Sequence, residues 1–230
     1  MFAFTLNHTV SSRSLGLRLA APVEIPAAVW VADDIEVAGR AGILTRLGGW
    51  EDNTLTLQLA IPTGDGVDGY RHAAAAFMHA TTVSLSGEPG VFRRVKHATV
   101  SPLSRELASW GMFEVELVCQ PFTYLETGLI PVTLTGSGTL TNPGLIEVAP
   151  VITIHGTGQL TLTVNGAQHR INSPSGQVTL DSDRLVAHVA GRVQTDALTG
   201  GFPTFTPGVN RVTLATGISK VVIVPNWRSP

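Results

Sequence analysis

Seven histidines have the widest chemical range in this sequence, because imidazole can bind a metal ion or carry a proton near neutral pH. Each lies in or beside an expected strand or helix, and they are scattered: His8, His72, His79, His97, His155, His169 and His188. His72 and His79 lie two helical turns apart, which is too far for both to chelate one metal ion directly. The sequence contains neither a Gly-x-Ser-x-Gly nor a His-Glu-x-x-His motif. The histidines therefore predict no catalytic or metal site.

Two other clusters could do chemistry, and each has a simpler interpretation. Asp181 and Asp183 supply far fewer oxygens than the six to eight that calcium prefers, so a type I turn explains them better. Residues 156–158, Gly-Thr-Gly, lie between two expected strands with no helix after them, which favours a hairpin turn over a phosphate loop. We expect no catalytic, metal-binding or cofactor-binding residues, no cofactor, and no enzymatic activity. A carboxylate pair for glycoside cleavage depends on distances in space and stays open.

Cys119 is the only cysteine, so it has no partner for an intramolecular disulfide or a zinc site. It lies in an alternating apolar stretch, 113–119, and we expect it to be a small buried hydrophobic residue.

The composition points to an assembly or to a β-rich surface. The chain has 230 residues, enough for one large or two modest domains, and only 14% are charged, against about 25% in typical proteins. Neighbouring subunits could hide much of the surface, or Thr, Ser and Asn could cover it in place of charges. The net charge is −2 with no basic block, which argues against tight nucleic-acid binding. No signal peptide or membrane-spanning run is evident, so we expect a chain that is made and soluble in the cytoplasm, with no membrane partner.

The stretch 37–61 organises the expected first domain. Residues 53–61 alternate strictly between apolar and polar, which is typical of a strand with one buried face. Four glycines precede this run, and we interpret the whole as two strands around a glycine-punctuated corner, with Trp50 plugging the turn. An ordinary hairpin is the simpler interpretation.

Other elements of the first domain follow from similar patterns. Leu15, Leu17 and Leu19 predict a short strand, and residues 29–37 predict another with a turn at Asp33-Asp34. The spacing of apolar residues predicts one helix over 69–80, with Asp68 as its N-cap.

Two later strands of this domain carry charges. Residues 91–100 form a strand carrying Arg93, Arg94 and Lys96, which we expect on a solvated face. The strand at 113–119 carries Glu114 and Glu116, which could pair with that basic strand.

A second domain begins near Leu129, where Thr, Gly, Ser and Asn dominate and helical patterns vanish. Short strands separated by turns predict a two-sheet sandwich, and Asn165-Gly166 is a strong two-residue hairpin turn. We expect domains at 1–128 and 129–230.

Several segments recur in a recognisable order over nearly the whole chain: residues 2–6 with 14–17, 39–42 leading to 50–52, 114–124, 140–144, 149–152, and 202–203 with 207–210. In this order and spacing, the chain resembles the distal tail proteins of long-tailed bacteriophages. Two departures mark a distant member of that family. Ala41 stands where the family often has Asp after Gly-Arg, and Pro143 is inserted in the Asn-Gly turn after Thr141.

The resemblance implies a mainly β protein with two parts. Residues 1–128 would be a β-sandwich-like, ring-forming domain with one α-helix, and 129–230 would be a galectin-like β-sandwich. The implied protein is a structural virion component that forms a ring, commonly a hexamer, at the distal end of the tail tube. This ring is the hub that joins the tube to the tail tip or baseplate and to host-adsorption proteins.

The same resemblance implies the partners. They are further copies of the chain, the tail tube protein, the tail-tip hub protein and a receptor-binding protein, while DNA passes through the ring without specific binding. The chain would reside in the virion tail, and in the host cytoplasm during assembly.

A galectin-like shape leaves one alternative, a host-recognition module that binds cell-wall saccharide. True galectins carry His-x-Asn-x-Arg and Trp-Gly-x-Glu, and the second domain has neither; residues 169–172, His-Arg-Ile-Asn, are the nearest look-alike and have the wrong spacing. Shape alone does not establish function. A glycan hydrolase is a third hypothesis, and the binding residues are unknown from the sequence.

Overall fold

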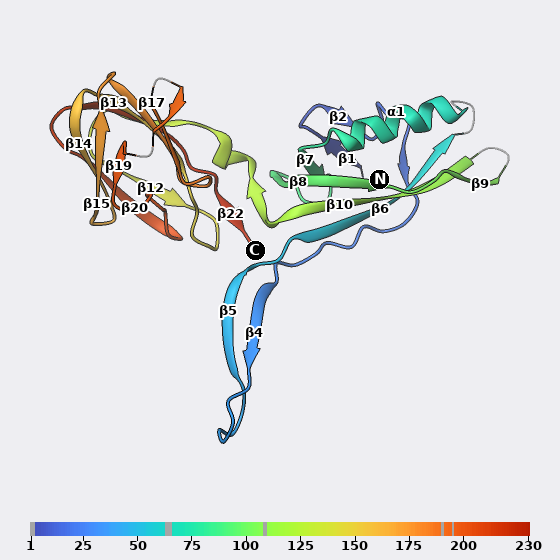
Figure 1. Ribbon diagram of the computed structural model, residues 1–230. Helices are drawn as coiled ribbons and strands as arrows, with labels where there is room; N and C mark the ends of the chain where they lie inside the picture. Colours follow the sequence, from blue (N-terminus) through green and yellow to red (C-terminus); the bar gives the residue numbers. More distant parts are fainter. Residues whose placement is uncertain (1–2, 63–65, 108–109, 190, 195) are drawn as a thin grey trace. The chain divides into compact units, whose positions relative to one another are not determined.

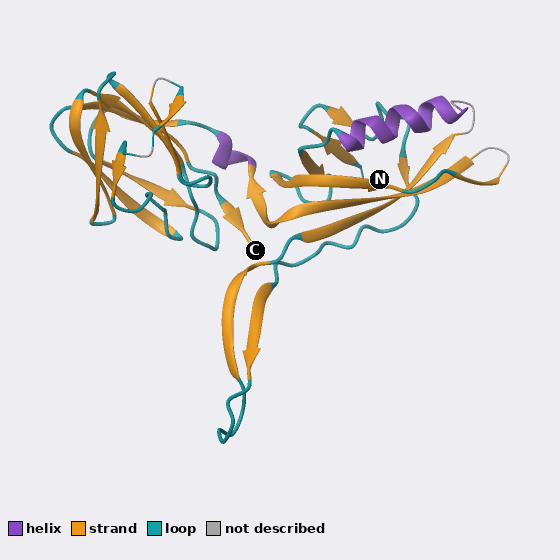
Figure 2. Ribbon diagram, in the orientation of Figure 1, coloured by secondary structure: helices purple, strands orange, loops and turns teal. Residues whose placement is uncertain are grey.

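A computed structural model describes residues 3–62, 66–107, 110–189, 191–194 and 196–230. Strands dominate the chain (Figure 2). They form two compact units, Met1–Thr123 with Pro230, and Tyr124–Ser229. The division falls a few residues before the expected domain boundary at 128, within strand β10.

Unit 1 is built on one antiparallel sheet with the strand order β2-β1-β7-β8-β10-β6-β3, and β9 pairs with β10. The helix α1 lies along this sheet (Figure 1), and Ala73 and Phe77 of the helix join the core that the strands form. The elements are β1 (Phe4–Leu6), β2 (Val10–Ser11), β3 (Arg18–Leu19), β6 (Asn53–Pro62), α1 (Gly66–Met78), β7 (Thr82–Leu85), β8 (Val91–Val100), β9 (Ser104–Leu107) and β10 (Trp110–Leu125).

Strand β6 shows why the sequence folds in this way. Its burial alternates residue by residue, and Leu55, Leu57 and Leu59 are completely buried. Antiparallel pairing sets Leu57 opposite Val115 on β10, so the buried faces of both strands meet the same core. The predicted strand at 53–61 is confirmed.

Two elements of unit 1 begin at other residues than the sequence predicted. The helix begins at Gly66, so Asp68 is not its N-cap but lies in the first turn, where its carboxylate accepts a bond from Arg71 at 3.1 Å. The expected strand over Leu15–Leu19 shrinks to Arg18–Leu19, because the chain before it forms a turn in which the Leu17 N–H donates to the carbonyl of Ser12. Leu15 and Leu17 still reach the core from this turn.

Unit 2 is a sandwich of two antiparallel sheets around its own core. One sheet has the order β11-β21-β13-β16-β17-β18, and the other has the order β12-β20-β14-β15-β19. The first contains β11 (Val132–Leu134), β13 (Val151–Gly156), β16 (Gln177–Asp181), β17 (Val186–Val189), β18 (Arg192–Val193) and β21 (Ile218–Val224). The second contains β12 (Gly138–Asn142), β14 (Gly158–Val164), β15 (Ala167–Ser173), β19 (Leu198–Thr199) and β20 (Gly208–Leu214).

Smaller elements complete unit 2. A 3-10 helix, η2 (Glu126–Leu129), follows β10, and β22 (Arg228–Ser229) ends the unit. The turn between β14 and β15 has positive φ at Asn165 and Gly166, as the predicted hairpin requires. Within the described part of the chain, no helix is both long and apolar enough to cross a bilayer.

Candidate assembly surface: the β4–β5 hairpin

The residues that the sequence analysis considered for catalysis or metal binding make structural contacts instead. His169 is buried, with Nδ1 at 2.7 Å from the carbonyl oxygen of Gly201. Asp181 accepts a bond from the backbone N–H of Arg184 at 3.0 Å, which is a local turn contact. No three His, Cys, Asp or Glu side chains among the described residues gather as metal ligands would.

Cys119 is fully buried, as its alternating strand predicted. Burial in the apolar core raises the pKa of the thiol to about 11; Arg93 nearby opposes this shift and Asp52 adds to it. The thiol therefore stays protonated at neutral pH and is a poor nucleophile.

Unit 2 does not present the features of a saccharide site. Sugar rings stack on exposed aromatic side chains, but the described aromatic residues of this unit are all buried or half-buried: Tyr124, Phe202, Phe205 and Trp227. The residues of the galectin look-alike serve the sheet, since His169 is buried and the Asn172 N–H donates to the Ala197 carbonyl. The saccharide alternative stays a prediction that the structure does not favour.

A two-stranded hairpin in unit 1 stands apart from these sites. Its strands are β4 (Trp30–Ile35) and β5 (Leu44–Trp50), and among the described residues they pair only with each other (Figure 1). The tip spans 36–43, where Gly39 and Gly42 supply the positive φ values that the reversal needs.

The hairpin corrects two expectations for this stretch. Asp33 and Asp34 lie inside β4 and not at a turn, because β5 supplies partners for them across the sheet. The hydroxyl of Thr45 donates to Asp34 at 2.7 Å, and Arg46 lies opposite Asp33. The expected glycine-punctuated corner is divided: one glycine pair forms the hairpin tip, and the other lies within β5.

A tryptophan pair anchors the base of the hairpin. Trp30 and Trp50 begin β4 and end β5, and their ring centroids are 3.9 Å apart. Trp50 also meets Phe122 of β10 edge to face at 5.3 Å. Trp50 lies in β5 at the base of the hairpin, so the prediction that it plugs a turn is wrong. Its ring instead joins the two strands to the sheet of unit 1.

Beyond this anchor, the hairpin exposes almost everything it carries. All strand residues except Val31 and Trp50 are exposed. The exposed fraction reaches 60% for Leu47 and 54% for Ile43, and the other large apolar residues here are Val29, Trp30, Ile35, Val37 and Leu44. The register places Leu44 and Leu47 on opposite faces, so apolar groups cover both sides.

Known structures share this arrangement of strands. A solved structure of SPP1 Dit (gp 19.1), described as a paradigm of the hub adsorption apparatus in phages that infect Gram-positive bacteria, aligns over 97% of this chain and 98% of its own. The TM-score is 0.66 and the identity is 17%. The chain has the fold of a phage distal tail protein. The predicted mainly β class, with one α-helix in unit 1 and a β-sandwich in unit 2, is thereby confirmed.

Two further solved structures align with the chain less closely. Chains of the phage p2 baseplate in its activated conformation, with Sr and with Ca, cover 96% and 97% of this chain at TM-scores of 0.46 and 0.47 and identities of 6% and 7%. No protein-family model matches the sequence, and no curated protein matches it either.

In this distal tail protein fold, the hairpin is the candidate assembly surface. An isolated two-stranded hairpin is marginally stable in water, and clustered exposed apolar groups mark protein interfaces. The sequence analysis did not identify this surface. Its signal was present in the sequence, because apolar residues occupy both odd and even positions on either side of the glycine-rich tip.

Proposed function

We propose that this chain is a non-enzymatic structural protein of a phage tail tip, and that copies of it join through the β4–β5 hairpin into a closed ring, six copies being the number expected from the resemblance. The observation that carries this proposal is the hairpin itself, whose apolar side chains are exposed on both faces in a chain with the distal tail protein fold. A hub of this kind joins the tail tube to tip, baseplate and receptor-binding proteins.

The energetics favour a ring over an isolated pair of copies. Fully burying a Val, Leu or Ile side chain stabilises by about 1.5–3 kcal/mol, so covering the exposed half of five such residues contributes about 5 kcal/mol. Association costs about 4–15 kcal/mol, so one hairpin contact is weak by itself. In a ring every copy gives one hairpin and receives another, and the last contact closes within the same assembly.

The charge of the chain supports a channel that DNA can pass. The net charge is −2, and the sequence carries no basic block that would hold phosphates. Passage without specific binding, a place in the virion tail, and assembly in the host cytoplasm complete the proposal.

The test is the native mass of the purified protein, measured over a range of concentrations. The unchanged chain should give a defined multiple of 24.2 kDa. Leu47→Asp should raise the concentration for half-assembly by about 30-fold or more, because a charge would replace a central apolar contact. Leu145→Asp is the matched control, since Leu145 is exposed in unit 2 and lies outside the hairpin. A parent chain that stays at 24.2 kDa at high concentration would refute the ring.

A further inference from the structure

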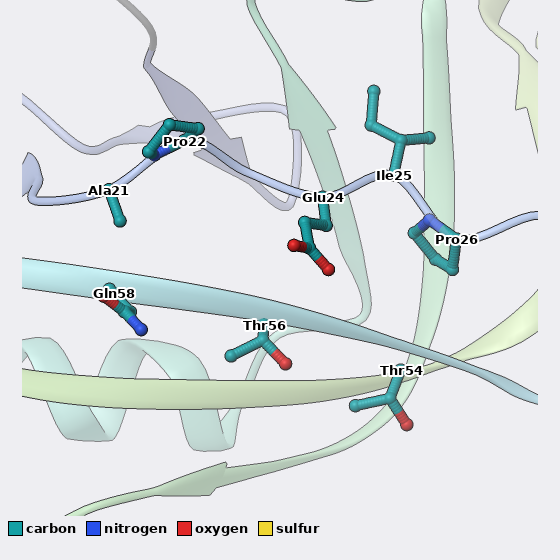
Figure 3. A pocket seen from close by; sticks show the side chains of 8 residues that line it. All are labelled: Ala21, Pro22, Glu24, Ile25, Pro26, Thr54, Thr56 and Gln58. Carbon is teal, nitrogen blue, oxygen red and sulfur yellow. The ribbon is translucent and has the colours of Figure 1, made fainter.

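The open pocket of unit 1 holds no pair of reactive groups. Its volume is about 580 Å³, and Figure 3 shows the carboxylate of Glu24 on one side and the polar side chains of Thr54, Thr56 and Gln58 on the other. Glu24 is the only titratable side chain among the lining residues, so it has neither a partner base nor a second metal ligand there. A reactive pair does occur in unit 2, at the turn between β14 and β15.

Asn165 and Gly166 form the one Asn-Gly pair of the sequence. The amide carbon of an asparagine side chain can be attacked by the backbone nitrogen of the next residue, and a side chain on that residue hinders the attack. Every other asparagine is followed by a residue that has a side chain: His8, Thr54, Pro143, Ser173, Arg211 and Trp227. Asn165 is therefore the asparagine that its neighbour protects least.

The turn that carries this pair is open to water. Both residues are exposed, and no atom lies within 4 Å of where a Cβ of Gly166 would be. In the part of the chain that the structure describes, no backbone carbonyl accepts the N–H of Gly166. The nitrogen that would attack is therefore accessible, and water can reach the same place.

Hydrogen bonds to β20 hold the Asn165 side chain in place. Its Oδ1 accepts the backbone N–H of Arg211 at 2.8 Å, and its Nδ2 donates to Oδ1 of Asn210 at 2.7 Å. The backbone N–H of Asn165 also donates to the Arg211 carbonyl at 2.9 Å. An attack needs the amide carbon of Asn165 to turn toward the Gly166 nitrogen, and this rotation breaks both side-chain bonds.

The partner amide of Asn210 is itself fixed. Asn210 is completely buried, and its Oδ1 also accepts the backbone N–H of Thr206 at 2.9 Å. Its Nδ2 donates to the carbonyls of Thr206 at 2.8 Å and Gly208 at 2.9 Å. Because every polar atom of this side chain is engaged, Asn210 holds a constant position for Asn165 to bind.

We propose that Asn165 is a deamidation site that the fold protects, and that it reacts when the contacts of the turn with β20 open. The Gly166 nitrogen loses its proton and bonds to Cγ of Asn165, while the bond from Cγ to Nδ2 breaks and ammonia leaves with that proton. The product of this step is a five-membered succinimide ring. Water then opens the ring at either carbonyl, which yields aspartate or isoaspartate at position 165. Water is the only co-reactant.

Either product weakens the turn. The aspartate carboxylate has no hydrogen to donate, and it faces Oδ1 of Asn210, which is also an acceptor. Isoaspartate adds one carbon to the backbone of a turn in which only two residues join Val164 to its partner Ala167. Because ammonia is lost, the change is one-way, and each chain that has opened at this turn keeps an added negative charge.

The rate of deamidation in the full chain tests the protection. Peptide mass spectrometry measures the fraction of Asn165 converted with time, in native protein and in protein unfolded by urea at the same pH and temperature. Two side-chain hydrogen bonds of ordinary net strength should make the native reaction about 30-fold slower. Equal rates in the two states, or main conversion at another asparagine in urea, would overturn the proposal.

Two variants of native protein test the role of Asn210. Asn210→Ala removes the acceptor of the Asn165 amide and should speed deamidation about fivefold. Thr206→Val is the matched control, because it removes only the hydroxyl that donates to the same Oδ1 at 3.3 Å and leaves the Asn165 bond intact. Its rate should change by less than about twofold. Equal rates in the two variants would contradict the protective contact, and the comparison with urea stands even if Asn210→Ala does not fold.

Asn165→Asp supplies one reaction product from the start. It should lower the urea concentration at which unit 2 unfolds, and aged protein that contains isoaspartate should show a larger decrease. An unchanged midpoint in both would overturn the expected weakening of the turn. All of these measurements use protein too dilute to assemble, so their outcome does not depend on the proposed ring.

Discussion

Strands β5 and β6 are neighbours in sequence and both carry leucines, but these leucines have opposite environments. Only Glu51 and Asp52 separate them. Leu57 in β6 is 0% exposed, whereas Leu47 in β5 is 60% exposed. The difference lies in the pattern: β6 restricts its leucines to one face, while the apolar residues of β5 fall on both.

This contrast separates two uses of hydrophobic residues. A strand with one apolar face can be satisfied by the core of its own chain, as β6 is by β10 and the helix. A hairpin with two apolar faces has no single core to face, and its apolar side chains stay exposed for the proposed contacts with other copies. The following predictions test this distinction, from the largest expected effect on stability to the smallest.

The largest difference should appear between matched leucine truncations. Leu57→Ala should lower the free energy of unfolding of unit 1 by about 2–5 kcal/mol, because it leaves a cavity in the core. Leu47→Ala should change it by less than about 0.5 kcal/mol, because its side chain is already in water. Chemical denaturation at concentrations below assembly measures both, and equal losses would mean that the hairpin packs on its own chain.

A second pair of variants compares polar contacts in the two regions. The Arg93 side chain is 4% exposed, and its guanidinium donates to both carboxylate oxygens of Glu88, at 2.6 and 3.2 Å. Glu88→Gln should destabilise unit 1 by about 3 kcal/mol, since it leaves a buried charge incompletely paired.

Asp34→Asn removes the charge from the exposed contact with Thr45 and should cost less than about 0.5 kcal/mol. The same denaturation experiment applies. An equally small loss for Glu88→Gln would show that the Arg93 pair contributes no more than a surface contact.

The stability of unit 1 should fall at alkaline pH because of Cys119. Its pKa is raised by burial from 9.0 to about 11, so the native state holds the thiol proton more tightly than the unfolded chain does. This stabilisation is complete below pH 9 and is lost as the pH rises through 11, and its size is about 2 kcal/mol. Denaturation between pH 8 and 11 measures the effect.

Cys119→Ala is the control for that experiment, and the slope attributable to the thiol should vanish in it. Native protein should also react slowly with thiol reagents at neutral pH. Rapid modification would contradict the buried, protonated state.

The smallest effect concerns the anchor between the two regions. Trp30→Ala should destabilise the hairpin by about 1 kcal/mol, because it removes the stack on Trp50. The near-ultraviolet circular dichroism of the coupled indoles should fall with it, while Trp30→Phe, which keeps an aromatic ring, should retain most of the stability. An unchanged spectrum in Trp30→Ala would show that the two rings do not interact.

The features that the sequence predicted well are those determined by near neighbours in the chain. Alternation in 53–61 identified a strand and its buried face, and Asn165-Gly166 identified a turn from the φ values that these residues tolerate. The burial of Cys119 followed from the same periodicity.

The features that the sequence did not predict depend on distant partners. Arg93 was expected on a solvated face beside Arg94 and Lys96, but the carboxylate of Glu88 lets it be buried. Asp33 and Asp34 suggested a turn, and only pairing with β5 explains their place inside a strand. The candidate assembly surface was missed for a related reason. Leu47 is exposed because no distant segment of the chain packs on it, and the sequence pattern does not show this.

Because the hairpin is a separate two-stranded sheet, folding of the chain can precede the proposed association of copies. Each chain can form its two cores by itself, because Leu57 and the other core residues pack against residues of the same chain. In the proposed ring, folding of a single chain would then be independent of how many copies surround it, whereas association would accelerate with protein concentration.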